Sequence, residues 1–205
     1  MASEPAVARV MDLLAEAGRQ SYGGEPVSQL EHALQAAHLA ESQGLDEEVV
    51  VASLLHDLGH LTPEARVALG DAAGEEPPDP VDQEERERRE AAGHGDAGAA
   101  FLGDAGSARL RWLIANHAAA KRYLCAIDAS YNERLSTVSR QTLAHQGGPM
   151  SLVECAEMER HPWREELIAL RRFDDEAKVP GQPTPDLSHY RPMLERQLQP
   201  DPTAS

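Results

Sequence analysis

The spacing of apolar residues along the chain predicts a protein built from helices. Val7, Val10 and Leu14 lie on one face of a helix that starts at Pro5 and ends at Gly18. Similar patterns predict further helices at 28–44, 46–57, 91–102, 107–125, 136–146, 162–174 and 188–198. Aromatic residues make up only 4% of the chain, while the helix formers Ala, Leu, Glu and Arg are abundant. We therefore expect an all-α fold.

Local signals mark where several of these helices begin. Ser28 is followed three residues later by Glu31, and Ser151 is followed by Glu154 in the same way. This spacing is typical of a capping box, in which each side chain satisfies a backbone N–H group of the other residue. The segment 46–57 differs from the rest, because residues 49–55 are apolar on every side. That pattern predicts a helix buried in the core, ending at His56 and Asp57.

The length and the course of the sequence favour one domain. Residues 1–180 contain the helical patterns, and an acidic, Pro-rich insertion at about 62–89 interrupts them. Residues 181–205 form a Pro-rich C-terminal tail with one short predicted helix. We therefore expect a single helical bundle with an acidic loop insertion.

The net charge and the cysteine content argue against several classes of partner and site. The formal net charge is −16, which argues against nucleic-acid and anionic-membrane partners, because both are bound mainly through clustered Lys and Arg. An anionic small-molecule substrate would need a local basic pocket. The two cysteines, Cys125 and Cys155, do not form a disulfide or thiolate-zinc pattern, and the chain has no apolar run as long as a membrane span. We expect a cytoplasmic protein, with its oligomeric state open.

Histidines and acids recur at the ends and centres of the predicted helices in an order that favours metal binding. An isolated histidine is more often a hydrogen-bonded core or surface residue than a ligand, and we keep that interpretation for His38, His145, His161 and His189. A histidine beside a carboxylate at the end of a buried helix would need a partner, and a metal ion satisfies both groups. The candidate ligands are His32, His56, Asp57, His94, His117 and Asp174.

Two motifs, HALQAAHLAE and LLHDLGH, resemble the HD superfamily, whose helical members bind one or two metal ions. Further segments resemble a narrower branch, the HD-domain mixed-valence diiron oxygenases of phosphonate catabolism: YGGEPVSQLEH, NHAAAKRYLCA, LSTVSRQTL, QGGPMS and LRRFDDEAK. The resemblance runs from about Tyr22 to Pro180. It implies that residues 1–180 form the HD domain. The branch usually has an acid after its third histidine, whereas Gly95 follows His94 here.

The resemblance implies two iron ions, Fe(II) and Fe(III), with O2 as co-substrate. One iron would be held by His32, His56, Asp57 and Asp174, and the other by Asp57, His94 and His117. His60 would lie beside the metals, and Tyr22 and Glu25 would form a gate that responds to substrate. For Tyr22 and Glu25 the alternative is an ordinary turn.

The resemblance also implies that Lys121, Ser139 and Arg171 grip the phosphonate of a small-molecule substrate. Lys121 lies four residues after His117, and Arg171 three residues before Asp174, so each cation shares a helix face with a candidate ligand. The alternatives are solvated helix cations for Lys121 and Arg171 and a helix-surface hydroxyl for Ser139.

The function expected from this resemblance is oxidative cleavage of the carbon–phosphorus bond of a 1-hydroxyphosphonate. The implied substrate is 2-amino-1-hydroxyethylphosphonate, giving phosphate and glycine, or its trimethylated analogue. Two alternatives stay open. The same ligands could serve a metal-dependent phosphohydrolase, or the chain could be a metal-free binding module on an HD scaffold.

Overall fold

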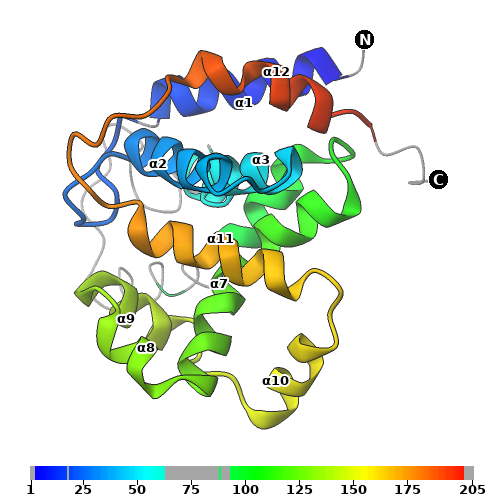
Figure 1. The fold of residues 1–205 in the computed structure, drawn as a ribbon. Helices are drawn as coiled ribbons and strands as arrows, with labels where there is room; N and C mark the ends of the chain where they lie inside the picture. The colour runs from blue at the N-terminus through cyan, green and yellow to red at the C-terminus, as the bar shows by residue number, and fades with distance from the viewer. Residues whose placement is uncertain (1–2, 18, 63–87, 89–92, 201–205) are drawn as a thin grey trace, which may run out of the picture.

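The computed structural model describes residues 3–17, 19–62, 88 and 93–200 (Figure 1). The named helices are α1 (Ser3–Ala17), α2 (Gln29–Ser42), α3 (Glu47–Leu55), α4 (Leu58–Leu61), α7 (Ala108–Ile127), α8 (Ala129–Arg134), α9 (Thr137–His145), α10 (Leu152–Glu159), α11 (Arg164–Glu176) and α12 (Leu187–Gln197). A further helical stretch covers 93–102. The described residues contain no strand, and the all-α expectation is confirmed. The predicted acidic insertion lies outside the described residues, apart from its edge at Thr62 and position 88.

The two capping boxes form as the sequence predicts. The Ser28 hydroxyl accepts the backbone N–H of Glu31, whose carboxylate accepts the backbone N–H of Ser28 at 2.8 Å. Ser151 and Glu154 repeat the arrangement at the start of α10. Each cap satisfies backbone groups that would otherwise lack partners at a helix start, which is worth about 1 kcal/mol.

The helices stack in layers around one core (Figure 1). α1 and α12 pack together on one side, α2 and α3 lie in the middle, and α7 and α11 pack against that middle layer. Residues 49–55 of α3 are all buried, so the predicted core helix is confirmed. α12 contributes Tyr190 and Leu194, each 0% exposed, to the same core. The domain boundary at residue 180 stays a prediction.

The chain departs from the predicted helix 46–57 at its end. α3 stops at Leu55, and His56 and Asp57 lie in the turn before α4. α4 then approaches the stretch 93–102 so closely that a Cβ on Gly59 would lie 1.8 Å from the His94 carbonyl oxygen. A Cβ on Gly95 would lie 2.5 Å from the carbonyl oxygen of Ala115 on α7. The glycine after His94 therefore allows the close packing that positions this histidine.

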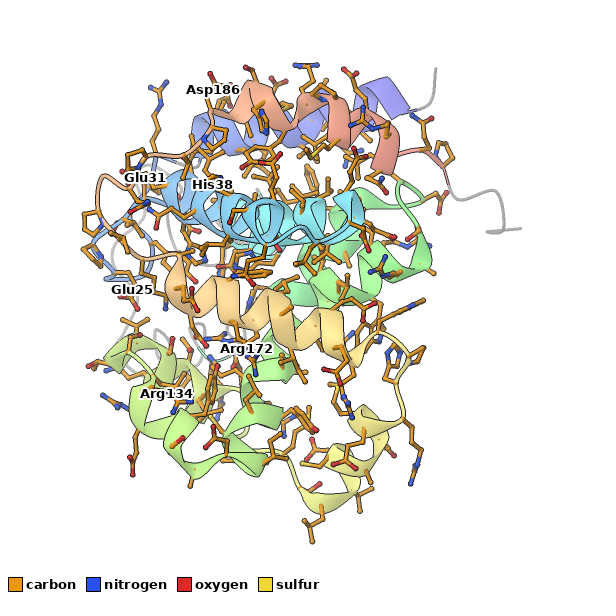
Figure 2. All side chains as sticks on the ribbon, viewed as in Figure 1. Glu25, Glu31, His38, Arg134, Arg172 and Asp186 are labelled. Atoms are coloured by element: carbon orange, nitrogen blue, oxygen red, sulfur yellow. The ribbon has the colours of Figure 1, made fainter. Side chains whose placement is uncertain are left out.

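Many charged side chains lie on the outer surface. Figure 2 shows Arg134 and Asp186 at the edges of the bundle, where both residues are exposed. Within the described residues, no helix has the length and apolar character needed to cross a membrane.

Candidate active site

Four buried histidines meet in two pairs at the centre of the bundle. His32 on α2 and His56 after α3 place their Nε2 atoms 3.1 Å apart. His94 in the stretch 93–102 and His117 on α7 place theirs 2.7 Å apart. None of the four is more than 6% exposed. The fold thus brings together histidines that are widely separated in the sequence.

In three of these rings, a backbone carbonyl group fixes a proton on Nδ1. In each of these rings, Nδ1 lies 2.7–2.8 Å from a backbone carbonyl oxygen. The oxygen belongs to Ala177 for His32, to Ser53 for His56 and to Ile114 for His117. A carbonyl oxygen only accepts, so each Nδ1 carries a proton, and Nε2 is the nitrogen of each ring that faces the cluster. The Nε2 atoms of His32 and His56 face each other across 3.1 Å. A metal cation between them would satisfy both.

Asp57 lies between the two histidine pairs. Its Oδ2 atom is 3.4 Å from His56 Nε2 and 3.6 Å from His32 Nε2. Its Oδ1 atom is 3.1 Å from His117 Nε2 and 3.6 Å from His94 Nε2. Oδ2 is buried and has no hydrogen-bond donor among the residues that the structure describes. One carboxylate oxygen therefore faces each pair, which is the arrangement that a carboxylate bridging two cations requires.

Asp174 and His60 complete the surroundings of the two pairs. Asp174 Oδ1 lies 3.4 Å from His32 Nε2, and its Oδ2 lies 2.7 Å from the guanidinium of Arg171. Burial alone would raise the pKa of Asp174, but Arg171 holds it well below its usual range. His60 stacks on His94 with ring centroids 4.1 Å apart. The nitrogen and oxygen donors of this cluster fit a metal ion such as iron, manganese or zinc.

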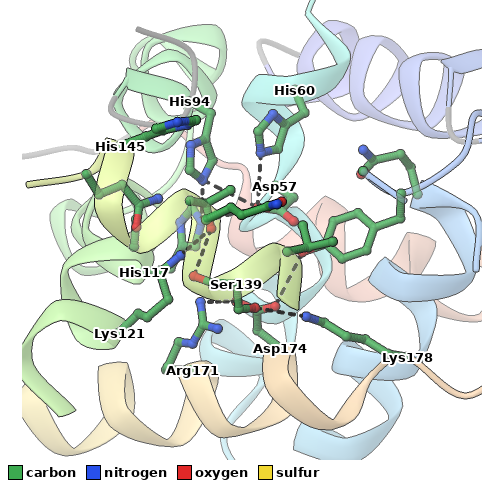
Figure 3. A pocket seen from close by; sticks show the side chains of 18 of the residues that line it. Asp57, His60, His94, His117, Lys121, Ser139, His145, Arg171, Asp174 and Lys178 are labelled. Carbon is green, nitrogen blue, oxygen red and sulfur yellow. Dashed lines mark hydrogen bonds and ion pairs between the residues drawn. The ribbon is translucent and has the colours of Figure 1, made fainter. Parts of the chain in front are cut away.

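A cavity of about 720 Å³ opens beside this cluster (Figure 3). Asp57, His94, His117 and Asp174 line one part of it. Its volume falls within the range of small-molecule sites. The remaining lining includes three cationic side chains and several hydroxyl and amide groups, among them Lys121, Arg171, Lys178, Ser139, Thr142 and Gln146.

Lys121 is a buried cation of this cavity. It is 3% exposed, so the alternative of a solvated helix cation is wrong. Its ammonium group donates to the hydroxyl of Thr142 at 2.7 Å. Burial and the nearby Arg171 lower the pKa of Lys121 to about 7. An anion bound beside it would favour the protonated form and strengthen the interaction.

Arg171 is also buried, at 4% exposure, which excludes the solvated alternative for this residue. Besides Asp174, its guanidinium contacts the carboxylate of Asp175 and donates from Nε to the hydroxyl of Tyr131 at 3.0 Å. Tyr131 comes from α8, a helix that the sequence did not predict. These three partners hold the guanidinium in one orientation at the cavity wall.

The structure places Ser139 and Tyr22 beside the cavity and the cluster, but not Glu25. Ser139 is 6% exposed and lines the cavity, so it is not a helix-surface hydroxyl. The Tyr22 ring stacks on His32 at 3.9 Å, and its hydroxyl lies 3.4 Å from Asp174 Oδ1. Glu25 is part of the same turn but is not among the cavity-lining residues.

Thr142 and Lys178 are among the cavity residues that sequence reasoning did not single out, and His145, for which a structural or surface role was expected, also lines the cavity. Lys178 belongs to the segment LRRFDDEAK, which pointed to the family, yet no spacing argument singled it out. The contacts of His161 and His189 agree with a structural or surface role. The ring of His161 stacks on Trp112 at 3.6 Å, and His189 Nε2 lies 2.9 Å from Glu41.

The chain belongs to the HD domain family, whose model matches residues 30–177. It is 39% identical over 181 residues to 1-hydroxy-2-(trimethylamino)ethyl phosphonate dioxygenase (glycine-betaine-forming) of Leisingera caerulea, covering 88% of this chain and 84% of that protein. It is 37% identical over 193 residues to hydroxymethylphosphonate dioxygenase of Gimesia maris, covering 94% of this chain and 88% of that protein. An uncharacterised protein of Acanthamoeba polyphaga mimivirus is 31% identical over 188 residues, which cover 90% of this chain and 78% of that protein.

Proposed function

We propose that this protein is an oxygenase that cleaves the carbon–phosphorus bond of a 1-hydroxyphosphonate. In the balanced reaction, RCH(OH)PO3H2 and O2 give RCOOH and H3PO4, so one O2 is consumed for each phosphate released. The four electrons come from the C–H and C–P bonds of the substrate. Two of the relatives are named as dioxygenases of phosphonates of this kind. One is named for hydroxymethylphosphonate and the other for 1-hydroxy-2-(trimethylamino)ethyl phosphonate.

One observation carries this proposal. Asp57 offers one oxygen to each of two histidine pairs, and the cavity beside it contains buried cations. We assign one iron to His32, His56, Asp57 and Asp174, and the other to Asp57, His94 and His117. When bound, the Fe(II)/Fe(III) pair supplies the redox chemistry with O2 that the side chains cannot supply.

The side chains bind and orient the substrate. The ammonium of Lys121, the guanidinium of Arg171 and the hydroxyl of Ser139 are assigned to the phosphonate, since charge-assisted hydrogen bonds to such an anion are the stronger kind. Tyr22, stacked on His32 and close to Asp174, is placed to shield the cluster until substrate displaces it. Its neighbours Gly23 and Gly24 have positive φ angles of 49° and 87°, a backbone conformation that glycine adopts without strain.

The reaction class can be tested by following O2. We expect the iron-loaded protein to release phosphate from hydroxymethylphosphonate or a substituted 1-hydroxyphosphonate with equimolar O2 uptake, and to release none without O2. A hydrolase would need only a Lewis acid and would work anaerobically with zinc or manganese. Equal phosphate release without O2, or full activity of the zinc form on a phosphate ester, would overturn the oxygenase proposal in favour of a phosphohydrolase.

Replacing Lys121 by methionine tests the anion pocket. We expect substrate affinity, measured anaerobically by calorimetry, to fall about tenfold to 100-fold, because a charge-assisted hydrogen bond contributes about 1.5–3 kcal/mol. Metal content should not change. Arg122→Met is the matched control, since Arg122 is the next residue on α7 and does not line the cavity. A loss of affinity below about threefold in Lys121→Met would place the anion pocket elsewhere.

A further inference from the structure

The cations that line the cavity differ in how their charges are compensated. Arg171 contacts the carboxylates of Asp174 and Asp175, which neutralise it. Lys121 donates to the hydroxyl of Thr142, and no carboxylate of the described residues lies within ion-pair distance of its ammonium. A phosphonate, like a phosphate monoester, carries more than one negative charge near neutral pH. A second cation with a free donor would therefore strengthen its binding.

Lys178 lies beside the hydroxyl group that is assigned to the phosphonate. Its ammonium donates to Ser139 Oγ at 3.3 Å (Figure 3). Because this oxygen accepts from Lys178, the hydroxyl keeps its own proton for an acceptor in the cavity. Both residues line the cavity, and the Lys178 side chain is only 14% exposed. An anion that accepts the Ser139 hydroxyl would therefore lie next to a largely buried ammonium group.

The partner of this ammonium outside the cavity lining is Glu25. Its Oε1 atom lies 3.1 Å from the ammonium of Lys178 and accepts the Ser136 hydroxyl at 2.6 Å. Glu25 is not among the cavity-lining residues. An ammonium group has three N–H donors, and acceptors within the described residues take two of them, one at Glu25 and one at Ser139. The third donor is therefore available to a ligand in the cavity.

The backbone on either side of Lys178 is held in place by α2. The carbonyl oxygen of Ala177 accepts the Nδ1–H of His32 at 2.8 Å. The side chain of Gln35 donates to the Val179 carbonyl at 2.8 Å and accepts the Val179 N–H at 3.0 Å. Lys178 is therefore positioned before a ligand arrives, which lowers the entropic cost of binding through its ammonium.

We propose that Lys178 binds the phosphonate as a second ammonium donor besides Lys121, while Glu25 keeps it at the cavity wall. The inference rests on the proposed function and adds a substrate-binding residue to it. The ammonium would meet the phosphonate next to Ser139, in a largely enclosed site where a charge-assisted hydrogen bond is strong. Because the carboxylate of Glu25 attracts the same ammonium and repels an anion, it would reduce the affinity that Lys178 supplies.

Two anions of nearly the same shape test this role. Methylphosphonate and methanesulfonate present the same tetrahedral group of oxygens, but the sulfonate carries a single negative charge. Neither has the hydroxyl group of the proposed substrates, so calorimetry on the metal-loaded protein measures binding alone. We expect the parent to favour methylphosphonate at least about tenfold in affinity. Lys178→Met should weaken methylphosphonate binding about tenfold to 100-fold and methanesulfonate binding less, so that the preference falls at least about threefold.

Glu25→Gln separates anion binding by Lys178 from a purely structural role of the ion pair. This substitution breaks the same pair from the other side and keeps the ammonium, so we expect methylphosphonate affinity to rise at least about threefold. If the pair served only to hold the turn, both substitutions would change affinity in the same direction. Lys178→Arg, which keeps the charge, should stay within about threefold of the parent.

Arg172→Met is the matched control, because it removes one positive charge from the exposed face of α11. Its affinity for methylphosphonate should change by less than about threefold. Equal loss of affinity for both anions in Lys178→Met, or weaker binding in Glu25→Gln, would overturn the inference. If Lys178→Met does not fold, Lys178→Gln is measured in its place. A parent that binds methylphosphonate through Lys178 but releases no phosphate from hydroxymethylphosphonate would refute the proposed reaction alone.

Discussion

Asp57→Ala is expected to empty both metal positions at once. The two oxygens of Asp57 face different histidine pairs, so its removal takes a ligand from each position and leaves the repulsion between two cations unscreened. Removing a residue that only hydrogen-bonds to a metal ligand typically lowers metal affinity by roughly 10–100-fold. We expect a larger decrease here, because Asp57 itself is a candidate ligand. Elemental analysis of the purified variant should find less than about a tenth of the parent's metal, and phosphate release should be abolished.

An acid close to the same site provides the comparison. Asp96 lies two residues after His94 on the same helical stretch and is exposed. Asp96→Ala should keep the parent's metal content. Circular dichroism would establish that both variants are folded. Near-normal iron in folded Asp57→Ala would refute the bridging role, whatever the remaining activity.

Arg171→Met is expected to have the largest effect on stability among the cavity residues. Arg171 is the buried cation between Asp174 and Asp175, and its loss leaves carboxylates without compensation. Breaking a buried ion pair from one side costs about 3–5 kcal/mol. We expect a decrease of that size in the free energy of unfolding, together with weaker phosphonate binding. Denaturant titration and anaerobic calorimetry measure the two effects separately.

The neighbouring arginine is a close control for this experiment. Arg172 is the next residue of α11 and is exposed, so Arg172→Met should change stability by less than about 0.5 kcal/mol. Arg171→Lys keeps the charge but cannot contact both carboxylates and Tyr131 in the same way. We expect it to recover part of the stability. An Arg171→Met protein as stable as Arg172→Met would show that the buried network does not depend on this guanidinium.

The sequence predicted what depends on local pattern. Helix starts at Ser28 and Ser151 follow from side chains three residues apart, and the buried α3 follows from its continuous apolar run. Lys121 and Arg171 were placed beside the ligands because a helix turn sets the distance along α7 and α11. The six candidate ligands do meet, although their metal-binding role stays a prediction.

What the sequence did not predict depends on contacts between distant segments. α8 is six residues long and mostly polar, so it has no clear periodicity, yet its Tyr131 orients Arg171. Lys178 follows the end of a helix, where spacing carries no information. Its place is set by contacts that join α2 to residues more than 140 positions later. The end of α3 was also misplaced: the helix ends at Leu55, two residues before the predicted end at Asp57, and no Gly or Pro at 55–57 marks this break.

The sequence has only two lysines, Lys121 and Lys178, and both line the cavity, which has a consequence for chemical modification. Any acylation of a lysine in this protein falls on Lys121 or Lys178, and therefore on the cavity wall. Acetylation would remove a positive charge there and alter anion binding directly, whereas in most proteins it falls largely on surface lysines. An amine-reactive label on Lys178, the more exposed of the two, would likewise report whether the cavity is filled. The extent to which Lys178 is labelled would therefore measure whether a ligand occupies the cavity.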